Sequence, residues 1–315
     1  MPASRIVVVV NPRSQAGALG RKWSFLAAQL RREVGAFEDV LTRAPGDATR
    51  LARQAIDSGA DIVIAIGGDG TINEVMNGFF EDGVPLQTDT ALGVLPFGTG
   101  GDFRKTLGIS KEIERSARVL RNGKRTKIDV GRLDFTTMKG EPQTRMFINI
   151  ASFGISGLVD EYVNNAPTKA LGGLVSFAFA TVRASLAYQN QRVQLVFDDD
   201  PKTQVERTVN TVAVCNGRYF GGGMFMAPDA RLDDGKFDVV TLGDMSTQDM
   251  LLNGYKIYRG THHGQSKVYH RLARKVEARP LGRDAVRLDV DGETPGKLPA
   301  TFTLLPAALA VMVPQ

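Results

Sequence analysis

Residues Asp61 to Gly78 read DIVIAIGGDGTINEVMNG, and this stretch predicts a strand, a glycine-rich turn and a helix in succession. The run Asp61–Ile66 is apolar and rich in β-branched residues, which is typical of a buried parallel strand. We expect Thr71 to be the N-cap of the helix and Asn77-Gly78 to end it. The unpaired N–H groups and the positive dipole end of such a helix would face the turn, where they favour a phosphate group.

The turn combines glycines with one acidic residue, Asp69. Glycine lets main-chain N–H groups approach an anion closely, whereas the Asp69 carboxylate would repel a phosphate unless a cation lay between them. A tight connection without a ligand is the usual explanation of a lone GxG pattern, but the polar residues that follow this one have no evident packing use. We therefore predict a site for a nucleotide and Mg²⁺, with these residues as nucleotide contacts: Gly67, Gly68, Asp69, Gly70, Thr71, Asn73 and Glu74.

Strands and helices alternate through the first 128 residues, which indicates a parallel sheet with helices on both faces. The pattern predicts helices over residues 19–34 and 48–58, and four strands: Arg5–Val10, Asp39–Thr42, Asp61–Ile66 and Ala91–Leu95. A second glycine loop, Pro96–Phe103, follows the last strand and again carries a hydroxyl group and an acid, those of Thr99 and Asp102. Two such loops at two strand ends strengthen the prediction of a ligand site.

The pattern changes after Ile128, where segments such as IDVGRLDF, RVQLVF and KFDVVTL alternate apolar and polar residues. This period of two predicts an antiparallel β domain. Lys169–Leu186 interrupts it with an apolar segment that we interpret as a helix, either covering the β core, which we favour, or contacting lipid. The predicted fold class is therefore α/β plus β, with an N-terminal three-layer α/β nucleotide-binding domain and a C-terminal antiparallel β-sandwich-like domain.

The composition agrees with two well-cored domains, since 43% of the 315 residues are hydrophobic and 23% are charged. The net charge of +5 would suit an anionic membrane surface or nucleotides, but no nucleic-acid motif accompanies it, so we expect no nucleic-acid partner. The single cysteine, Cys215, cannot form an internal disulfide, and Ile6–Val10 is too short for a signal peptide, so a cytoplasmic protein is expected. The histidines suggest no metal-ligand set, and we expect them to be exposed to solvent: His262, His263 and His270.

The segment GGDGTINEVMNG resembles the signature of the diacylglycerol kinase catalytic-domain family, which includes sphingosine kinases and bacterial lipid kinases. NAD kinases share its GGDG core, so the core alone does not fix the substrate. Further motifs follow in the order of the family: Asn11-Pro12, Gly46-Asp47-Ala48, Gly67 to Glu74, Gly98 to Phe103, Asp234-Gly235 and Asp291-Gly292-Glu293. The resemblance implies that ATP and Mg²⁺ serve to transfer the γ-phosphoryl group to a lipid hydroxyl in a cleft between domains. It also implies that the end of the chain returns to the first domain, which gives domains of 1–128 with 302–315, and 129–301.

The resemblance also assigns roles to individual residues. Asn11 and Thr42, at the ends of two strands, are expected to contact the nucleotide, as is Thr99 of the second glycine loop. A structural Mg²⁺ in the second domain would be held by one carboxylate and two main-chain oxygens, those of Asp234, Arg231 and Lys236. Several carboxylates are expected to organise Mg²⁺ and water at the cleft: Asp69, Asp102, Asp129 and Asp234.

The resemblance also implies that Glu293 is the base that accepts the proton of the lipid hydroxyl, with Asp291 as its nearest rival, and Asp69 completes the expected catalytic set. The sequence departs from the family pattern at Gln15-Ala16, where a glycine and a basic residue are common, and at Gly101, where asparagine is common. Two alternatives stay open, namely an enzyme like NAD kinase and a regulator that binds lipid or nucleotide without turnover. We expect a lipid substrate at a membrane surface with peripheral membrane contact, and a homodimer is left open.

Overall fold

The computed structural model describes residues 4–98, 100–157 and 188–315. The predicted nucleotide contact Thr99 and the predicted helix Lys169–Leu186 lie outside these described residues. The chain divides into two compact units, Met1–Asp129 with Pro306–Gln315, and Val130–Leu305. Two strands, β7 (Lys124–Thr137) and β19 (Gly296–Val313), carry the chain from the first unit to the second and back.

The first unit is built on a parallel sheet whose central strands are apolar along their whole length. The strand order is β2-β1-β3-β6, and the end of β19 joins β6 through Val311 and Leu92. The four strands are β1 (Ile6–Val10), β2 (Glu38–Leu41), β3 (Ile62–Gly67) and β6 (Ala91–Pro96). Every residue of β1, β3 and β6 is buried, as expected when helices cover both faces of a parallel sheet.

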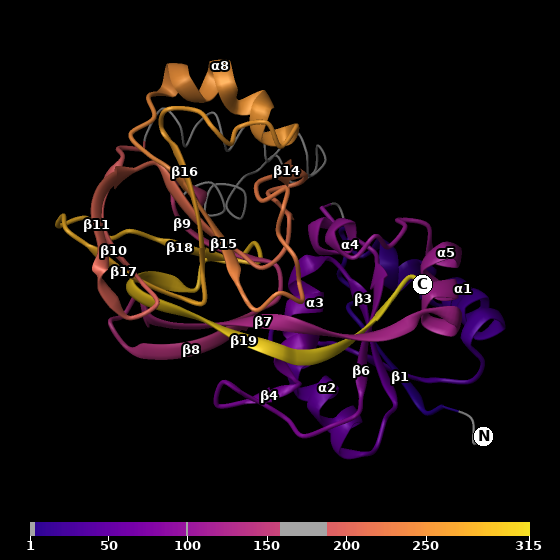
Figure 1. The fold of residues 1–315 in the computed structure, drawn as a ribbon. Helices are drawn as coiled ribbons and strands as arrows, with labels where there is room; N and C mark the ends of the chain where they lie inside the picture. The colour runs from indigo at the N-terminus through magenta and orange to yellow at the C-terminus, as the bar shows by residue number, and fades with distance from the viewer. Residues whose placement is uncertain (1–3, 99, 158–187) are drawn as a thin grey trace. The chain divides into compact units, whose positions relative to one another are not determined.

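Helices cover the two faces of this sheet in pairs. Helix α1 (Ala18–Val34) packs beside α5 (Ile113–Asn122) on one face, and α2 (Asp47–Asp57) packs beside α3 (Asp69–Asn77) on the other (Figure 1). One stripe of α1, at spacings of three and four residues, is buried: Leu19, Trp23, Leu26 and Leu30. Three short elements belong to the same unit: α4 (Asp102–Thr106), β4 (Phe80–Glu81) and β5 (Val84–Pro85). The predicted three-layer α/β domain is therefore confirmed.

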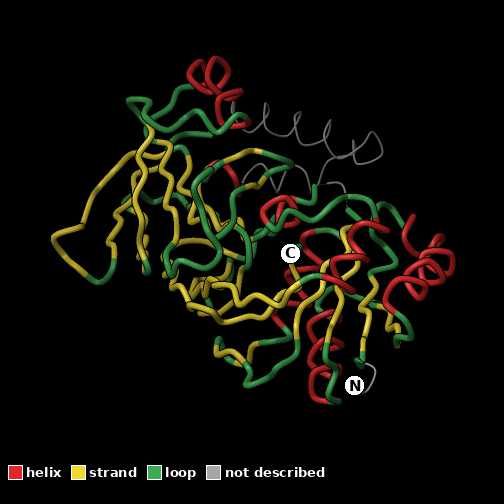
Figure 2. Tube along the Cα trace, turned by 45° about the vertical axis from the view of Figure 1, so that its right-hand side comes forward, coloured by secondary structure: helices red, strands yellow, loops and turns green. Residues whose placement is uncertain are grey.

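The second unit consists mainly of antiparallel strands, drawn in yellow in Figure 2. One sheet has the order β16-β15-β12-β9-β18, and the other has the order β11-β10-β17-β19, with β7 beside β19 and β8 beside β7. The strands of the unit that begin after β7 and precede β19 are β8 (Pro142–Phe147), β9 (Ile150–Gly154), β10 (Gln191–Phe197), β11 (Asp200–Val209), β12 (Thr211–Cys215), β13 (Tyr219–Phe220), β14 (Met224–Phe225), β15 (Phe237–Leu242), β16 (Val268–Ala273), β17 (Lys275–Pro280) and β18 (Leu288–Val290).

Phenylalanines from both sheets meet in the core of this unit. Phe147 of β8 stacks on Phe237 of β15 with ring centroids 5.5 Å apart, and Phe153 of β9 stacks on Phe302 of β19 at 6.0 Å. Alternate residues of a single strand point into the same core, as in β10, where Val193, Leu195 and Phe197 are buried. These contacts confirm the predicted β-sandwich-like domain.

The connection after helix α8 (Thr247–Tyr258) gives a result that the sequence did not predict. His262 is only 1% exposed, and its Nε2 lies 3.0 Å from the main-chain oxygen of Met226. The ring of His263 lies next to those of His262 and His270, with centroid distances of 4.6 and 5.1 Å. The prediction of solvent exposure is therefore wrong for His262, because the loop folds back against the segment that follows β14.

Within residues 4–98, 100–157 and 188–315, every helix falls short of the length or the apolarity that a bilayer span requires.

Candidate active site

The four parallel strands of the first unit end at the same level, so the residues that follow them share one edge of the sheet. Val10 of β1 is paired with Leu41 of β2 and with Ile66 of β3, and Ile66 is paired with Leu95 of β6. Strand β2, the next in the chain, lies on one side of β1, and β3 lies on the other side. The strand order therefore reverses between β1 and β3. Ligands of open α/β sheets bind at such a reversal, beyond the carboxyl ends of the strands.

Asn11 and Thr71 bridge this reversal. Asn11, directly after β1, donates from Nδ2 to Oγ1 of Thr71 at 3.0 Å. The prediction that Thr71 is the N-cap of α3 is wrong. The helix begins at Asp69 after the extended Gly68, because the N–H of Ile72 already donates to the main-chain oxygen of Gly68 at 3.1 Å. Thr71 lies in the first turn of the helix, where its hydroxyl accepts the Asn11 amide.

Two other segments reach the same edge. The N–H of Thr42, directly after β2, donates to the main-chain oxygen of Val10 at 2.9 Å. Gln15 donates from Nε2 to the main-chain oxygen of Gly98 at 3.3 Å. Gln15 and Ala16 have φ angles of 51° and 52°, a left-handed conformation that glycine adopts at lower cost. At Gln15-Ala16, where the sequence departs from the family pattern, two residues with side chains therefore adopt a backbone conformation that suits glycine.

The two glycine loops touch through their backbones. A Cβ atom at Gly98 would lie 2.6 Å from Cα of Gly68, and one at Gly67 would lie 2.5 Å from Oγ1 of Thr71. The N–H of Phe97 also donates to the main-chain oxygen of Gly67 at 2.7 Å. Close approach therefore explains why Gly67 and Gly98 are glycines, since a side chain at either position would collide with its neighbour.

Asp69 joins the two loops through its carboxylate. Its Oδ2 accepts the N–H groups of Gly101 at 2.8 Å and Asp102 at 3.2 Å, and its Oδ1 accepts that of Phe103 at 3.3 Å. We call these three hydrogen bonds the Asp69 clasp. Burial raises the pKa of Asp69 and the nearby charge of Asp102 raises it further, although the three N–H groups oppose this shift. Asp102 itself pairs with Nζ of Lys105 at 2.7 Å.

Two other predicted nucleotide contacts have partners in the α2–α3 layer. Asn73 is fully buried, and its Oδ1 accepts the side-chain amide of Asn77 at 3.1 Å. Glu74 accepts the N–H of Ala48 in the first turn of α2 through Oε2 at 3.3 Å, which suits a carboxylate at a helix N-terminus. Gly70 lies in the first turn of α3. The Asn73 contact therefore lies within α3, whereas the Glu74 contact joins α3 to α2.

The remaining predicted metal ligands lie in different settings. Asp129 lies inside β7, is buried, and accepts the N–H of Ala307 of β19 through Oδ1 at 2.8 Å. Asp234 lies in an exposed turn, where its Oδ1 accepts the N–H of Lys236 at 3.1 Å, and the neighbouring Arg231 is exposed as well. Among the residues that the structure describes, no three His, Cys, Asp or Glu side chains lie close enough together to hold a metal ion. The structure thus brings Asp69 and Asp102 together and gives Asp129 a strand-joining contact.

The acids of the second unit occupy a tight turn between β18 and β19. Asp291 and Gly292 have φ angles of 49° and 88°, and Val290 and Glu293 pair across them, as in a two-residue turn of type I′. Oδ2 of Asp291 accepts an N–H group at 2.9 Å, and Oδ1 accepts two at 3.1 and 3.0 Å, from three consecutive residues: Ile148, Asn149 and Ile150. The carboxylate of Glu293 is 43% exposed and pairs with Arg145 of β8 at 2.7 Å.

Sequence reasoning missed Arg145 and Lys105, the two basic partners of these acids. Lys105 stands three residues after Asp102 on one helix, a spacing that brings opposite charges together and could have indicated the pair. Arg145 gave no such signal, because it reaches Glu293 from a strand that is remote in the sequence. Both cations bind acids of the predicted site.

Comparison with known proteins identifies relatives of this chain. Residues 5–133 match the family model described as the diacylglycerol kinase catalytic domain, and residues 149–313 match the YegS C-terminal NAD kinase beta sandwich-like domain. A protein of Bacillus subtilis named diacylglycerol kinase is 31% identical over 276 residues, which cover 87% of this chain and 84% of that protein. A protein of Staphylococcus saprophyticus with the same name is 27% identical over 312 residues, which cover 99% of this chain and 96% of that protein.

Solved structures share the fold. The crystal structure of a diacylglycerol kinase from Bacillus anthracis has a TM-score of 0.71 at 21% identity and covers 99% of this chain and 98% of its own. Yeast NADH kinase in complex with NADH has a TM-score of 0.51 at 10% identity and covers 100% of this chain and 84% of its own. These likenesses concern the fold, whereas the matches in sequence decide the family. The chain belongs to the diacylglycerol kinase family, a family of lipid kinases.

Proposed function

We propose that this protein transfers the γ-phosphoryl group of ATP to the hydroxyl group of a lipid, with a diacylglycerol as the acceptor. The observation that carries the proposal is the Asp69 clasp, which holds two glycine loops in backbone contact beside the strand reversal of the sheet. Such an edge is where α/β domains bind ligands that carry phosphate groups. The name diacylglycerol kinase, which the relatives from Bacillus subtilis and Staphylococcus saprophyticus carry, supports the choice of acceptor.

Glu293 is the proposed base. Its carboxylate is partly exposed, and its ion pair with Arg145 holds it in one orientation. Asp291 is the weaker candidate, because both of its oxygens accept main-chain N–H groups. In the proposed reaction, the lipid oxygen forms a bond to the γ-phosphorus while its proton passes to Glu293. The bond between the γ-phosphorus and the oxygen of the leaving ADP breaks in the same step.

Mg²⁺ is part of the proposal. When bound with ATP, it would neutralise charge on the β- and γ-phosphates during transfer. Asp69 and Asp102 are the carboxylates proposed to hold it, since their proximity and burial raise the pKa of Asp69, and a divalent cation beside them would offset that repulsion. Asp234 stays the proposed carboxylate of a structural site in the second unit, with the main-chain oxygens of Arg231 and Lys236.

The proposal is tested by incubating the purified protein with ATP, Mg²⁺ and diacylglycerol in detergent micelles and identifying the products by mass. We expect the phosphate monoester of diacylglycerol and ADP in equal amounts. A parallel incubation with NAD tests the NAD kinase alternative, and phosphorylated NAD as the sole product would reject the proposal. ATP binding without a phosphorylated lipid, with Mg²⁺ or Mn²⁺ and over a broad lipid mixture, would instead support the non-catalytic regulator.

A further inference from the structure

Helix α8 presents large apolar side chains to solvent. Leu252 is 72% exposed and Tyr255 is 54% exposed, and Tyr258 is 48% exposed at the end of the same helix. Single exposed apolar residues are ordinary on a soluble protein and need no explanation. Here, however, they fall within two turns of one helix, which stands at the margin of the second unit (Figure 1).

The exposed side of α8 combines these residues with positive charge. Leu252, Tyr255 and Arg259 are spaced by three and four residues, so they form one stripe along the helix. The Arg259 guanidinium lies 5.6 Å from the centre of the Tyr255 ring, and Lys256 adds a second cation in the last turn. Residues 252–260 contain no acid. We call Leu252, Tyr255, Lys256 and Arg259 the α8 stripe.

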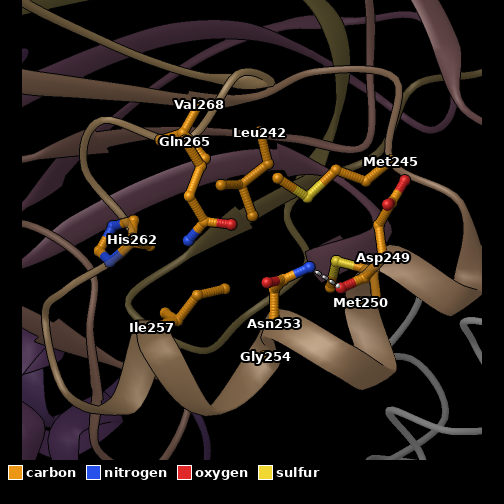
Figure 3. Close-up of a pocket in the computed structure, with 10 residues that line it drawn as sticks. All are labelled: Leu242, Met245, Asp249, Met250, Asn253, Gly254, Ile257, His262, Gln265 and Val268. Carbon is orange, nitrogen blue, oxygen red and sulfur yellow. Dashed lines mark hydrogen bonds between the residues drawn. The ribbon is translucent and has the colours of Figure 1, made fainter.

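Helix α8 is firmly attached to its unit, so loose packing does not explain the exposure. Ser246 and Asp249 form a capping box at the start of the helix, and Asp249 also pairs with Lys267 at 2.7 Å. Met250 and Ile257 line a small cavity on this inner side together with the residues drawn in Figure 3. The helix therefore has one side that packs on the β unit and another that carries apolar and basic groups outward.

We propose that the α8 stripe docks the protein onto a bilayer that contains anionic phospholipids. A leucine and a tyrosine ring can enter the boundary between headgroups and acyl chains, while the lysine and arginine side chains extend to the anionic headgroups. The net charge of +5 favours the same surface. The role of this docking rests on the proposed function, because an enzyme with a lipid acceptor must reach a membrane. Docking itself requires no nucleotide.

Sedimentation with lipid vesicles, without ATP, tests this inference. We expect the wild-type chain to bind vesicles of phosphatidylcholine with phosphatidylglycerol, and to bind vesicles of pure phosphatidylcholine at least about fivefold more weakly. The double variant Leu252→Ser/Tyr255→Ser should lose at least about tenfold in binding to the anionic vesicles. The double variant Lys256→Gln/Arg259→Gln should lose most of the preference for anionic lipid and most of the dependence on salt.

The matched control is Phe25→Ser on α1, which removes a side chain that is 67% exposed in the first unit and should leave vesicle binding unchanged. Circular dichroism and gel filtration of each variant confirm folding and report the oligomeric state. The inference is overturned if the wild type binds no vesicle, if Leu252→Ser/Tyr255→Ser binds as the wild type does, or if that variant converts a dimer to a monomer. Vesicle binding through α8 by a protein that phosphorylates no lipid would reject the proposed function and leave the docking intact.

Discussion

Asp69 in the first unit and Asp291 in the second use the same device in different surroundings. Each precedes a glycine, and each accepts three main-chain N–H groups from a distant segment, residues 101–103 for Asp69 and 148–150 for Asp291. Beside the first stands another acid, Asp102, and beside the second stands Glu293. The comparison teaches that the aspartate of each Asp-Gly pair anchors a distant backbone segment, and that a second acid with a basic partner stands beside it: Asp102 with Lys105, and Glu293 with Arg145.

Removing the Asp69 carboxylate should give the largest effect. Asp69→Ala leaves three N–H groups of the second glycine loop without their acceptor, so we expect turnover to fall at least about 10³-fold and local stability to fall by about 3 kcal/mol. Asp69→Asn keeps one acceptor oxygen and should lose less stability. Steady-state kinetics with ATP and diacylglycerol measure the first effect, and amide hydrogen exchange measures the second.

The same exchange experiment compares the two units directly. Asp69→Ala should speed exchange at Gly101 and Phe103 and leave Ile148 and Ile150 protected, whereas Asp291→Ala should do the reverse. If Asp69→Ala left the amides of residues 101–103 as protected as in the wild type, the clasp would not anchor the loop. The parallel between the two aspartates would then fail.

Glu293→Gln sharpens the comparison, because it changes an acid whose described partner is a side chain, that of Arg145. We expect turnover to fall by about 10² to 10³-fold, since the amide cannot accept the proton, while stability changes by less than about 0.5 kcal/mol. Glu141→Gln is the matched control, because this exposed glutamate precedes β8 and should leave turnover unchanged. If Glu293→Gln kept full turnover, Glu293 would not be the base. Either Asp291 or no side chain would then accept the proton.

Local patterns predicted the parallel strands of the first unit and the strand pattern of the second, but not helices α5 and α8. Contacts between distant segments limited what the sequence could predict of the site. The run Asp61–Ile66 predicted β3 because a strand buried on both faces must be apolar throughout. The prediction that Thr71 is the N-cap was wrong because the helix already includes Asp69 and Gly70. The glycines of the loop obscured this earlier start in the sequence. The Asp69 clasp and the Arg145–Glu293 pair join residues that no local pattern links.

Gly98 tests whether the two glycine loops must touch. Gly98→Ala would place Cβ 2.6 Å from Cα of Gly68, so we expect a loss of about 1 to 3 kcal/mol in stability and a KM for ATP raised about tenfold. Gly68→Ala is the matched control for stability, because its Cβ would have an ordinary 3.8 Å contact with Cα of Gly98. Urea unfolding measures both variants, and equal stability of the two would mean that the loops move apart at little cost.

A last prediction concerns stability alone: His262 in the second unit and Asp69 in the first respond to acid with opposite signs. In the second unit, burial and, to a smaller extent, the nearby His263 lower the pKa of His262 from 6.5 to about 4, so the folded unit holds the neutral ring at neutral pH. The stability from His262 is therefore complete above pH 6.5 and is lost as the pH falls toward 4. The raised pKa of Asp69 acts oppositely, since its contribution is present at low pH and is lost as the pH rises through the folded value.

We expect the second unit to lose on the order of 2 kcal/mol between pH 6.5 and 4, and His262→Gln to remove most of this loss. Hydrogen exchange at strand β15, corrected for the intrinsic effect of pH and compared with β3 in the first unit, measures the difference. His270→Gln is the control of opposite sign, because its hydrogen bond to Asp238 raises the pKa of His270, so the stability it contributes is lost as the pH rises. An unchanged acid response in His262→Gln would show that another group titrates, and the contrast between the two units would then have a different origin.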